Sequence, residues 1–220
     1  MTPRGSIGVV VPVRDGGRYL DAALDSLERC ADVGQVVVVD DASRDDSATI
    51  AERRAGVELI RRTEQVGPAA ARNLGVAALD REIVGFLDAD DRWTVAGTDP
   101  RLDPLHRDPE LDIVFARLCM LRRRADGGEE RSAPRRHMQL GAALVRRRLF
   151  DRIGGFDPAA IPAEDLDWFA RARQAGARMN FVPAVTLDYR RHAGQLTSSS
   201  EILVSSTLLA ARRALGRRRR

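Results

Sequence analysis

Short runs of β-branched and other apolar residues alternate, along the first half of the chain, with segments whose apolar residues recur at helical spacing. The runs predict buried strands at residues 8–13, 35–39, 57–60 and 83–87. The intervening segments predict helices at about residues 18–29, 46–55 and 69–79. Strands that alternate with helices at this interval are typical of βαβ units. The pattern therefore predicts an α/β fold with a mostly parallel central sheet flanked by helices.

The second half of the chain is less regular. Three prolines between residues 100 and 109 precede a strand predicted at 112–121. Residues 122–137 are polar and rich in arginine, which predicts a surface loop, and residues 141–145 are small and apolar. Further elements are predicted as helices at 146–153, 163–175 and 201–215, and as strands at 178–182 and 185–190. One domain is expected over residues 1–199, followed by a C-terminal helix and a basic tail over 200–220.

Acidic residues follow two of the predicted strands directly. Asp40 and Asp41 end the second run, and Asp88, Asp90 and Asp91 follow the fourth. The carboxyl edge of an open α/β sheet is where such folds bind ligands. Side chains two residues apart on extended backbone point the same way, so Asp88 and Asp90 could face one divalent cation. The alternative is that these aspartates belong to a solvated acidic loop without a ligand. That alternative is less favoured when two strands end in this way, because carboxylates clustered at one edge repel one another unless a cation or a hydrogen-bond donor offsets the repulsion.

Composition excludes several classes of function. All 36 of the Lys and Arg residues are arginine. The absence of lysine excludes enzymes that form a Schiff base on lysine and nucleotide triphosphatases that need the lysine of a phosphate-binding loop. The net charge is +4, and six arginines among residues 212–220 leave −2 for the rest, which argues against a nucleic-acid partner. Cys30 and Cys119 make no disulfide framework. No apolar run is long enough to span a bilayer, and a cytoplasmic protein is expected. The basic tail is either solvated or makes a peripheral contact at the inner membrane face.

Seven short motifs occur in a specific order along the chain. They are VVPV at 10–13, VDDAS at 39–43, GPAAARNLG at 67–75, FLDADD at 86–91, GGFD at 154–157, ED at 164–165 and YRRH at 189–192. Each is common on its own, but the ordered series resembles the inverting GT-A glycosyltransferases of family two over about residues 7–199. Members of that family transfer a sugar from a nucleotide-diphosphate donor.

The resemblance implies the GT-A fold of nucleotide-diphospho-sugar transferases, with a Rossmann-like N-terminal half. Residues 1–95 would form the nucleotide-binding half and residues 96–199 the acceptor-binding half. The residues that it implies for the nucleotide are Pro12, Val13, Asp15, Asp41, Arg72 and Asp88. For Arg72, whose planar guanidinium suits phosphate oxygens, the alternative is an ordinary surface arginine on a helix.

The resemblance also implies a divalent cation, Mn²⁺ or Mg²⁺. A sugar nucleotide leaves as a diphosphate whose charge must be neutralised, and hard oxygen ligands suit the cation. Asp90 would bind the cation directly, and Asp88 would bind the ribose or reach the cation through water. His192 lies where some members have a histidine ligand, although an isolated histidine is as often structural.

Inversion at the anomeric carbon needs a base that takes a proton from the attacking acceptor hydroxyl. The resemblance places this base in the pair Glu164 and Asp165, with Asp165 as the base and Glu164 as its support or as an acceptor contact. Favourable interaction with a helix dipole is the structural alternative for both. Gly155, Phe156 and Asp157 would shape the acceptor side.

The expected function is therefore inverting transfer of one sugar from a nucleotide-diphosphate sugar, with a UDP-sugar as the expected donor. The acceptor would be a hydroxyl of a glycan, a lipid-linked molecule or a small molecule. Arg14 departs from the family, because an aromatic residue is common there, and the Gln-x-x-Arg-Trp signature of processive members is absent. Alternatives are a catalytically inactive nucleotide-sugar-binding or scaffold module, and a sugar-phosphate nucleotidyltransferase. A nucleotidyltransferase normally needs a glycine-rich, basic loop that binds the triphosphate. Residues 14–18 match such a loop poorly, and the chain has no lysine.

Overall fold

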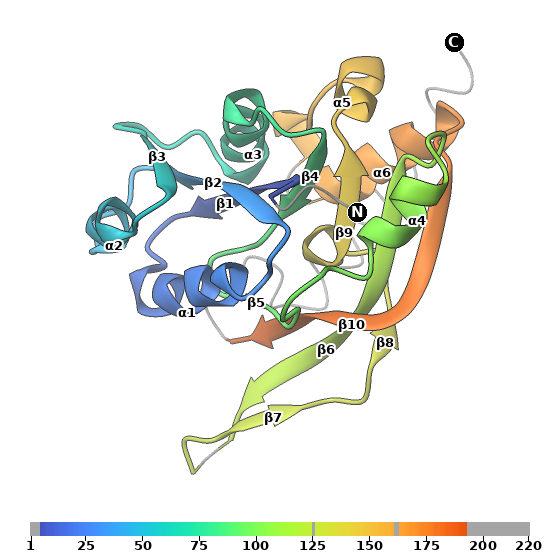
Figure 1. Ribbon diagram of the computed structural model, residues 1–220. Helices are drawn as coiled ribbons and strands as arrows, with labels where there is room; N and C mark the ends of the chain where they lie inside the picture. Colours follow the sequence, from blue (N-terminus) through green and yellow to red (C-terminus); the bar gives the residue numbers. More distant parts are fainter. Residues whose placement is uncertain (1–4, 125, 161–162, 193–220) are drawn as a thin grey trace.

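Ten strands form one sheet in the computed structural model of the chain, which describes residues 5–124, 126–160 and 163–192 (Figure 1). The strands are β1 (Ile7–Val13), β2 (Val33–Asp40), β3 (Val57–Arg61), β4 (Ile83–Phe86), β5 (Arg92–Trp93), β6 (Ile113–Arg123), β7 (Glu129–Arg131), β8 (Arg135–Arg136), β9 (Ala143–Arg146) and β10 (Met179–Arg191). The helices are α1 (Gly17–Glu28), α2 (Ser47–Arg53), α3 (Pro68–Ala78), α4 (Leu102–Arg107), α5 (Arg148–Ile153) and α6 (Glu164–Gln174). Single 3₁₀ turns cover Leu140–Ala142 and Pro158–Ala160.

The two halves of the sheet differ in strand direction. The sheet order is β3-β2-β1-β4-β9-β6-β10-β5, and β7 and β8 pair with β6. The first four of these strands are parallel, as predicted. Beyond them β9 runs antiparallel to both β4 and β6, so the complete sheet is mixed. The loops that follow β1, β2, β3 and β4 therefore meet at one edge, which is the edge where open α/β sheets bind ligands.

Alternating side chains of β1 pack on opposite faces of the sheet. Val9 and Val11 belong to one cluster of buried residues with Leu20 of α1, whereas Val10 belongs to a second cluster with Ala69 of α3. Figure 1 accordingly shows α1 and α3 on opposite sides of β1. The α3 backbone approaches β1 closely at Gly75, where a Cβ atom would overlap the side chain of Val10. This glycine lets α3, which carries several predicted site residues, lie directly against the sheet.

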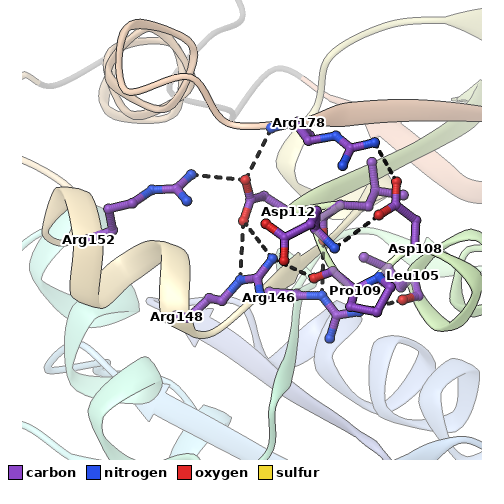
Figure 2. Close-up of polar contacts among 10 residues, drawn as sticks. Leu105, Asp108, Pro109, Asp112, Arg146, Arg148, Arg152 and Arg178 are labelled. Carbon is purple, nitrogen blue, oxygen red and sulfur yellow. Dashed lines mark hydrogen bonds and ion pairs between the residues drawn. The ribbon is translucent and has the colours of Figure 1, made fainter.

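A buried carboxylate joins the start of β6 to α5 and β10. Figure 2 shows Arg148 and Arg152 of α5 converging on Asp112, at 3.4 and 2.9 Å, and the backbone N–H of Arg178 donates to it at 3.1 Å. Burial acts to raise the pKa of Asp112, but the bonds from Arg152 and Arg178 and the charge of Arg148 outweigh it, and the pKa is lowered. Asp112 therefore stays charged and fixes the second half of the sheet.

The segment predicted as a surface loop at residues 122–137 contains regular structure. It includes the end of β6 and the strands β7 and β8, which both pair antiparallel with β6, so the prediction of a loop was wrong there. All side chains of β7 and β8 are exposed, and exposed strands leave no apolar alternation in a sequence.

Two other differences follow from proline. The strands predicted at 178–182 and 185–190 form the single strand β10, whose register against β6 shifts around Pro183. The proline-rich segment contains α4, with Pro104 in its first turn, where a missing N–H costs nothing. The helix predicted at 201–215 and the basic tail lie outside the described residues. Within the described ranges, no helix is long and apolar enough to cross a membrane.

Candidate active site

Three aspartates occupy the turn that follows β4. Asp91 is only 1% exposed, and its Oδ1 accepts a hydrogen bond of 2.8 Å from the backbone N–H of Arg190 in β10. Burial raises the pKa of Asp91, and the neighbouring charges of Asp90 and Asp88 raise it further. Asp91 thus anchors the turn to β10, a role that the sequence did not indicate, while Asp88 and Asp90 remain half-buried.

The structure brings His192 to Asp90. Their side chains meet at 2.9 Å, from His192 Nε2 to Asp90 Oδ2. The imidazole packs on the ring of Tyr19 from α1, with 5.1 Å between ring centroids. Arg190 lies over the same tyrosine and donates to the backbone oxygen of Asp90 at 2.9 Å and to Glu129 of β7 at 2.6 Å. Side chains from α1, β7 and β10 therefore hold the acidic turn and the histidine together.

This pair of atoms fits a divalent cation. The 2.9 Å contact between Asp90 Oδ2 and His192 Nε2 is a hydrogen bond, and a cation bound by both groups would take the place of the proton between them, since carboxylate and imidazole are both ligands of such ions. No group of three or more acidic, histidine or cysteine side chains that could hold a metal occurs in the described part of the chain. A complete coordination shell thus requires water or substrate oxygens.

Arg72 of α3 joins two carboxylates from distant parts of the sequence. Its Nη2 donates to Asp88 Oδ1 at 2.8 Å, and its Nη1 donates to Glu164 Oε1 at 2.7 Å. Burial opposes the charge of Arg72, which is 7% exposed, but Asp88 and Glu164 outweigh burial and raise its pKa. Arg72 is therefore no ordinary surface arginine, and it connects the turn after β4 with the start of α6.

Glu164 and Asp165 open the first turn of α6, but their environments differ. Glu164 is held by Arg72, whereas Asp165 Oδ1 accepts a hydrogen bond of 2.7 Å from the backbone N–H of Leu166. Burial raises the pKa of Asp165, and the charges of Glu164 and Asp88 add to the effect against the opposing charge of Arg72. The raised pKa makes Asp165 a better proton acceptor than an ordinary aspartate, because its basicity is closer to neutral pH.

The loop at residues 154–157 is fixed to α3 by Asn73. The Asn73 Nδ2 donates to the backbone oxygen of Phe156 at 2.8 Å, and its Oδ1 accepts from the Phe156 N–H at 2.8 Å. The Phe156 ring is buried and packs edge-on against Phe86 at 5.5 Å. Phe156 therefore anchors the loop through its side chain, and an acceptor contact of this loop is left to Gly155 and Asp157.

Gly155 and Asn73 make a testable pair, since a Cβ atom on Gly155 would overlap Asn73 Oδ1. We expect Gly155→Ala to displace the Asn73 side chain and to destabilise the protein by about 1–3 kcal/mol, because polar groups lose their partners. In the background of Asn73→Ala, the same substitution should cost less, since the obstructing amide is gone. Chemical denaturation of the two single variants and the double variant measures this coupling. Strictly additive costs would contradict the proposed contact.

Asp41 is buried and holds the loop that precedes α3. Its Oδ1 accepts from the Val66 N–H at 2.6 Å, and its Oδ2 accepts from the Gly67 N–H at 2.9 Å. The resemblance implies Asp41 as a residue that binds the nucleotide, and a hydrogen bond that its carboxylate accepted from a nucleobase N–H would add to these two bonds. The carboxylate therefore already has a structural task next to α3.

Asp15 ties the loop after β1 to the loop after β2. It adopts a positive φ of 49°, its N–H donates to Ser43 Oγ at 3.0 Å, and its Oδ1 accepts from the Arg44 N–H at 2.7 Å. Pro12 is half-buried beside this connection, whereas the Val13 side chain lies in the core, which leaves only its backbone for a ligand. Pro12, Val13, Asp15 and Asp41, which are four of the six residues implied for the nucleotide, thus lie at the carboxyl edge.

Comparison with known proteins gives consistent matches. Residues 8–156 match the family model for Glycosyl transferase family 2. The Pre-mycofactocin glycosyltransferase of Mycobacterium tuberculosis (strain ATCC 25618 / H37Rv) is 32% identical over 212 residues, which cover 86% of this chain and 43% of that protein. The chain spans about half the length of the curated relatives that it matches.

Solved structures show the same architecture. S. aureus TarS 1-349 in complex with UDP has a TM-score of 0.68 at 20% identity, covering 93% of this chain and 64% of that one. The mannosyltransferase PcManGT from Pyrobaculum calidifontis, in complex with GDP-Man and Mn²⁺, has a TM-score of 0.68 at 22% identity, covering 96% and 65%. At these identities the likeness concerns the fold.

Proposed function

Because the chain belongs to glycosyltransferase family 2 and has the GT-A fold, we propose that it transfers one sugar from a nucleotide-diphosphate sugar to an acceptor hydroxyl, with inversion. One observation carries the proposal. Arg72 links Asp88, at the end of the nucleotide-side strand β4, to Glu164, which adjoins the candidate base Asp165. Groups suited to the donor and to the acceptor thus share one edge of the sheet.

The donor would lie along the carboxyl ends of β1, β2 and β4. Pro12 and Val13 would border the base, Asp15 and Asp88 would lie near the ribose, and Arg72 would lie near the diphosphate. Structures of this fold with UDP and with GDP-Man support a nucleotide-sugar donor. A UDP-sugar remains the donor expected from the resemblance.

Asp90 and His192, which a 2.9 Å hydrogen bond brings together, would hold the cation, Mn²⁺ or Mg²⁺. When bound, the cation supplies positive charge that neutralises the leaving diphosphate. Asp91 keeps Asp90 in place through its bond to β10, and Tyr19 supports the imidazole from the other side. Both side chains would thus be in position before any substrate arrives.

Nucleoside diphosphate binding tests this assignment. We expect the wild-type protein to bind uridine diphosphate at least about tenfold more tightly with Mn²⁺ than with a chelator, because a cation offsets repulsion between phosphate and the acidic turn. Asp90→Asn should remove most of that difference, whereas Asp103→Asn, on the far helix α4, should leave it intact. Calorimetry measures all three proteins. Equal affinities with Mn²⁺ and chelator for the wild type would contradict the assignment.

The proton transfer falls to Asp165. The acceptor oxygen forms a bond to the anomeric carbon while the bond from that carbon to the diphosphate breaks, and the acceptor proton moves to an Asp165 carboxylate oxygen. Glu164 is less suited, since Arg72 already holds it at 2.7 Å. Arg72 thereby orients the pair, and Asn73, the next residue of α3, fixes the loop beside it.

A further inference from the structure

A depression of about 760 Å³ lies beyond the carboxyl ends of β1, β2 and β3. Four of the residues that line it are the arginines Arg14, Arg44, Arg61 and Arg62, and the others are small or uncharged. All four arginines are exposed. The depression thus presents several guanidinium groups at the ligand-binding edge of the sheet, and we call it the arginine pocket.

The charge of the arginine pocket is not balanced within its walls. The high arginine content of the protein does not by itself explain this excess of positive charge, because other depressions of the same protein are lined by acidic residues as well. Asp108 lines a depression next to Arg178 and bonds to it at 2.7 Å, as Figure 2 shows. Asp80, Glu82 and Asp151 line another. No carboxylate lines the arginine pocket among the described residues.

The ion pairs of the four arginines are few and long. Arg14 lies 3.8 Å from Asp15, and Arg61 lies 3.9 Å from both Asp40 and Glu52. Among the ion pairs of the described ranges, none involves Arg44 or Arg62. Exposed pairs at such distances neutralise little charge. At least two guanidinium groups can therefore attract an anion from solution.

A cluster of carboxylates lies one strand away. The acidic turn with Asp88 and Asp90 follows β4, and β1 separates β4 from β2 in the sheet. With about 4.8 Å between neighbouring strands, β2 and β4 are roughly 10 Å apart. An anionic diphosphate approaching this edge meets repulsion at the acidic turn and attraction at the arginine pocket.

From this arrangement we propose that the arginine pocket is an anion-capture site, which attracts the diphosphate of the nucleotide sugar during encounter and so speeds donor association. The inference rests on the proposed function and deepens it. A concave site lined by one sign of charge concentrates oppositely charged ligands and raises their association rate. The pocket acts before the donor settles, so it changes the association rate and not the dissociation rate.

Binding kinetics of uridine diphosphate with Mn²⁺ test the inference, with guanosine diphosphate in its place if that binds more tightly. In Arg44→Gln/Arg62→Gln, we expect the association rate at low ionic strength to fall about tenfold, with the dissociation rate changed by less than about twofold. The gap from the wild type should narrow as salt is added, since salt screens exposed charges.

The matched control is Arg29→Gln/Arg53→Gln, which removes the same charge from exposed positions at the ends of α1 and α2, on the opposite edge of the sheet. It should associate at the wild-type rate. An unchanged association rate in the pocket variant, or an equal fall in the control, would overturn the inference and leave the proposed function standing. Failure of the wild type to bind either nucleotide would overturn both.

Discussion

Replacing Asp165 with asparagine is expected to lower the transfer rate by about 10²–10⁴-fold and to change nucleoside diphosphate affinity by less than about twofold. An amide of nearly the same shape cannot take the acceptor proton. The donor residues lie on other elements, so their binding should persist. Steady-state transfer assays and calorimetry on the same preparation separate the two effects.

Asp151→Asn is the matched control, because Asp151 is an exposed aspartate in the first turn of α5. If Asp165 acts only on the helix dipole, both variants should lose a few tenths to about 1 kcal/mol of stability and keep their turnover. Near-normal transfer by Asp165→Asn would remove the base assignment.

The pH dependence of the wild type gives an independent check on Asp165. A base works only when deprotonated, and burial raises the pKa of this carboxyl. The transfer rate should therefore fall as pH drops through that raised pKa, at a higher pH than for an ordinary aspartate. A rate profile of kcat/KM against pH that stays flat down to the usual aspartate range would contradict a base with a raised pKa.

The second large effect concerns stability. Arg72→Met should lower the free energy of unfolding by about 3–5 kcal/mol, because it leaves Glu164 buried without its partner and removes a bond to Asp88. The double variant Arg72→Met/Glu164→Leu should recover part of the loss, since no unpaired charge then remains. Urea denaturation measures the free energy of unfolding for each variant.

An exposed ion pair provides the control for the stability loss of Arg72→Met. Arg107 and Asp103 of α4 lie 2.8 Å apart with side chains 78% and 59% exposed, so Arg107→Met should cost less than about 1 kcal/mol. A similar small cost for Arg72→Met would show that the bridge between α3 and α6 contributes little to the fold.

The parallel half of the sheet could be predicted because each of its strands is a run of apolar residues and each connecting helix has an apolar stripe. The position of β9 could not be predicted, since its insertion between β4 and β6 depends on pairing between segments that are distant in the sequence. The strands β7 and β8 left no signal, because their exposed side chains are charged like those of a loop.

The candidate site shows a similar division. The motifs placed Asp88, Asp90 and Asp165 at ends of elements, where the structure has them. The bridge from Arg72 to Glu164 joins residues 92 positions apart and arises only when α3 packs near α6. Asn73 stands in the same motif as Arg72, but its partner is the backbone of Phe156, which no residue type reveals.

Acceptor-dependent release of a nucleoside diphosphate is the direct sign of sugar transfer by this protein. The protein would be incubated with Mn²⁺ and, separately, UDP-glucose, UDP-N-acetylglucosamine and GDP-mannose, each with a panel of hydroxyl acceptors. At least one donor should be consumed only when an acceptor is present, and Asp165→Asn should slow this release by about 10²–10⁴-fold. Absence of both binding and release for every donor would contradict the proposed function.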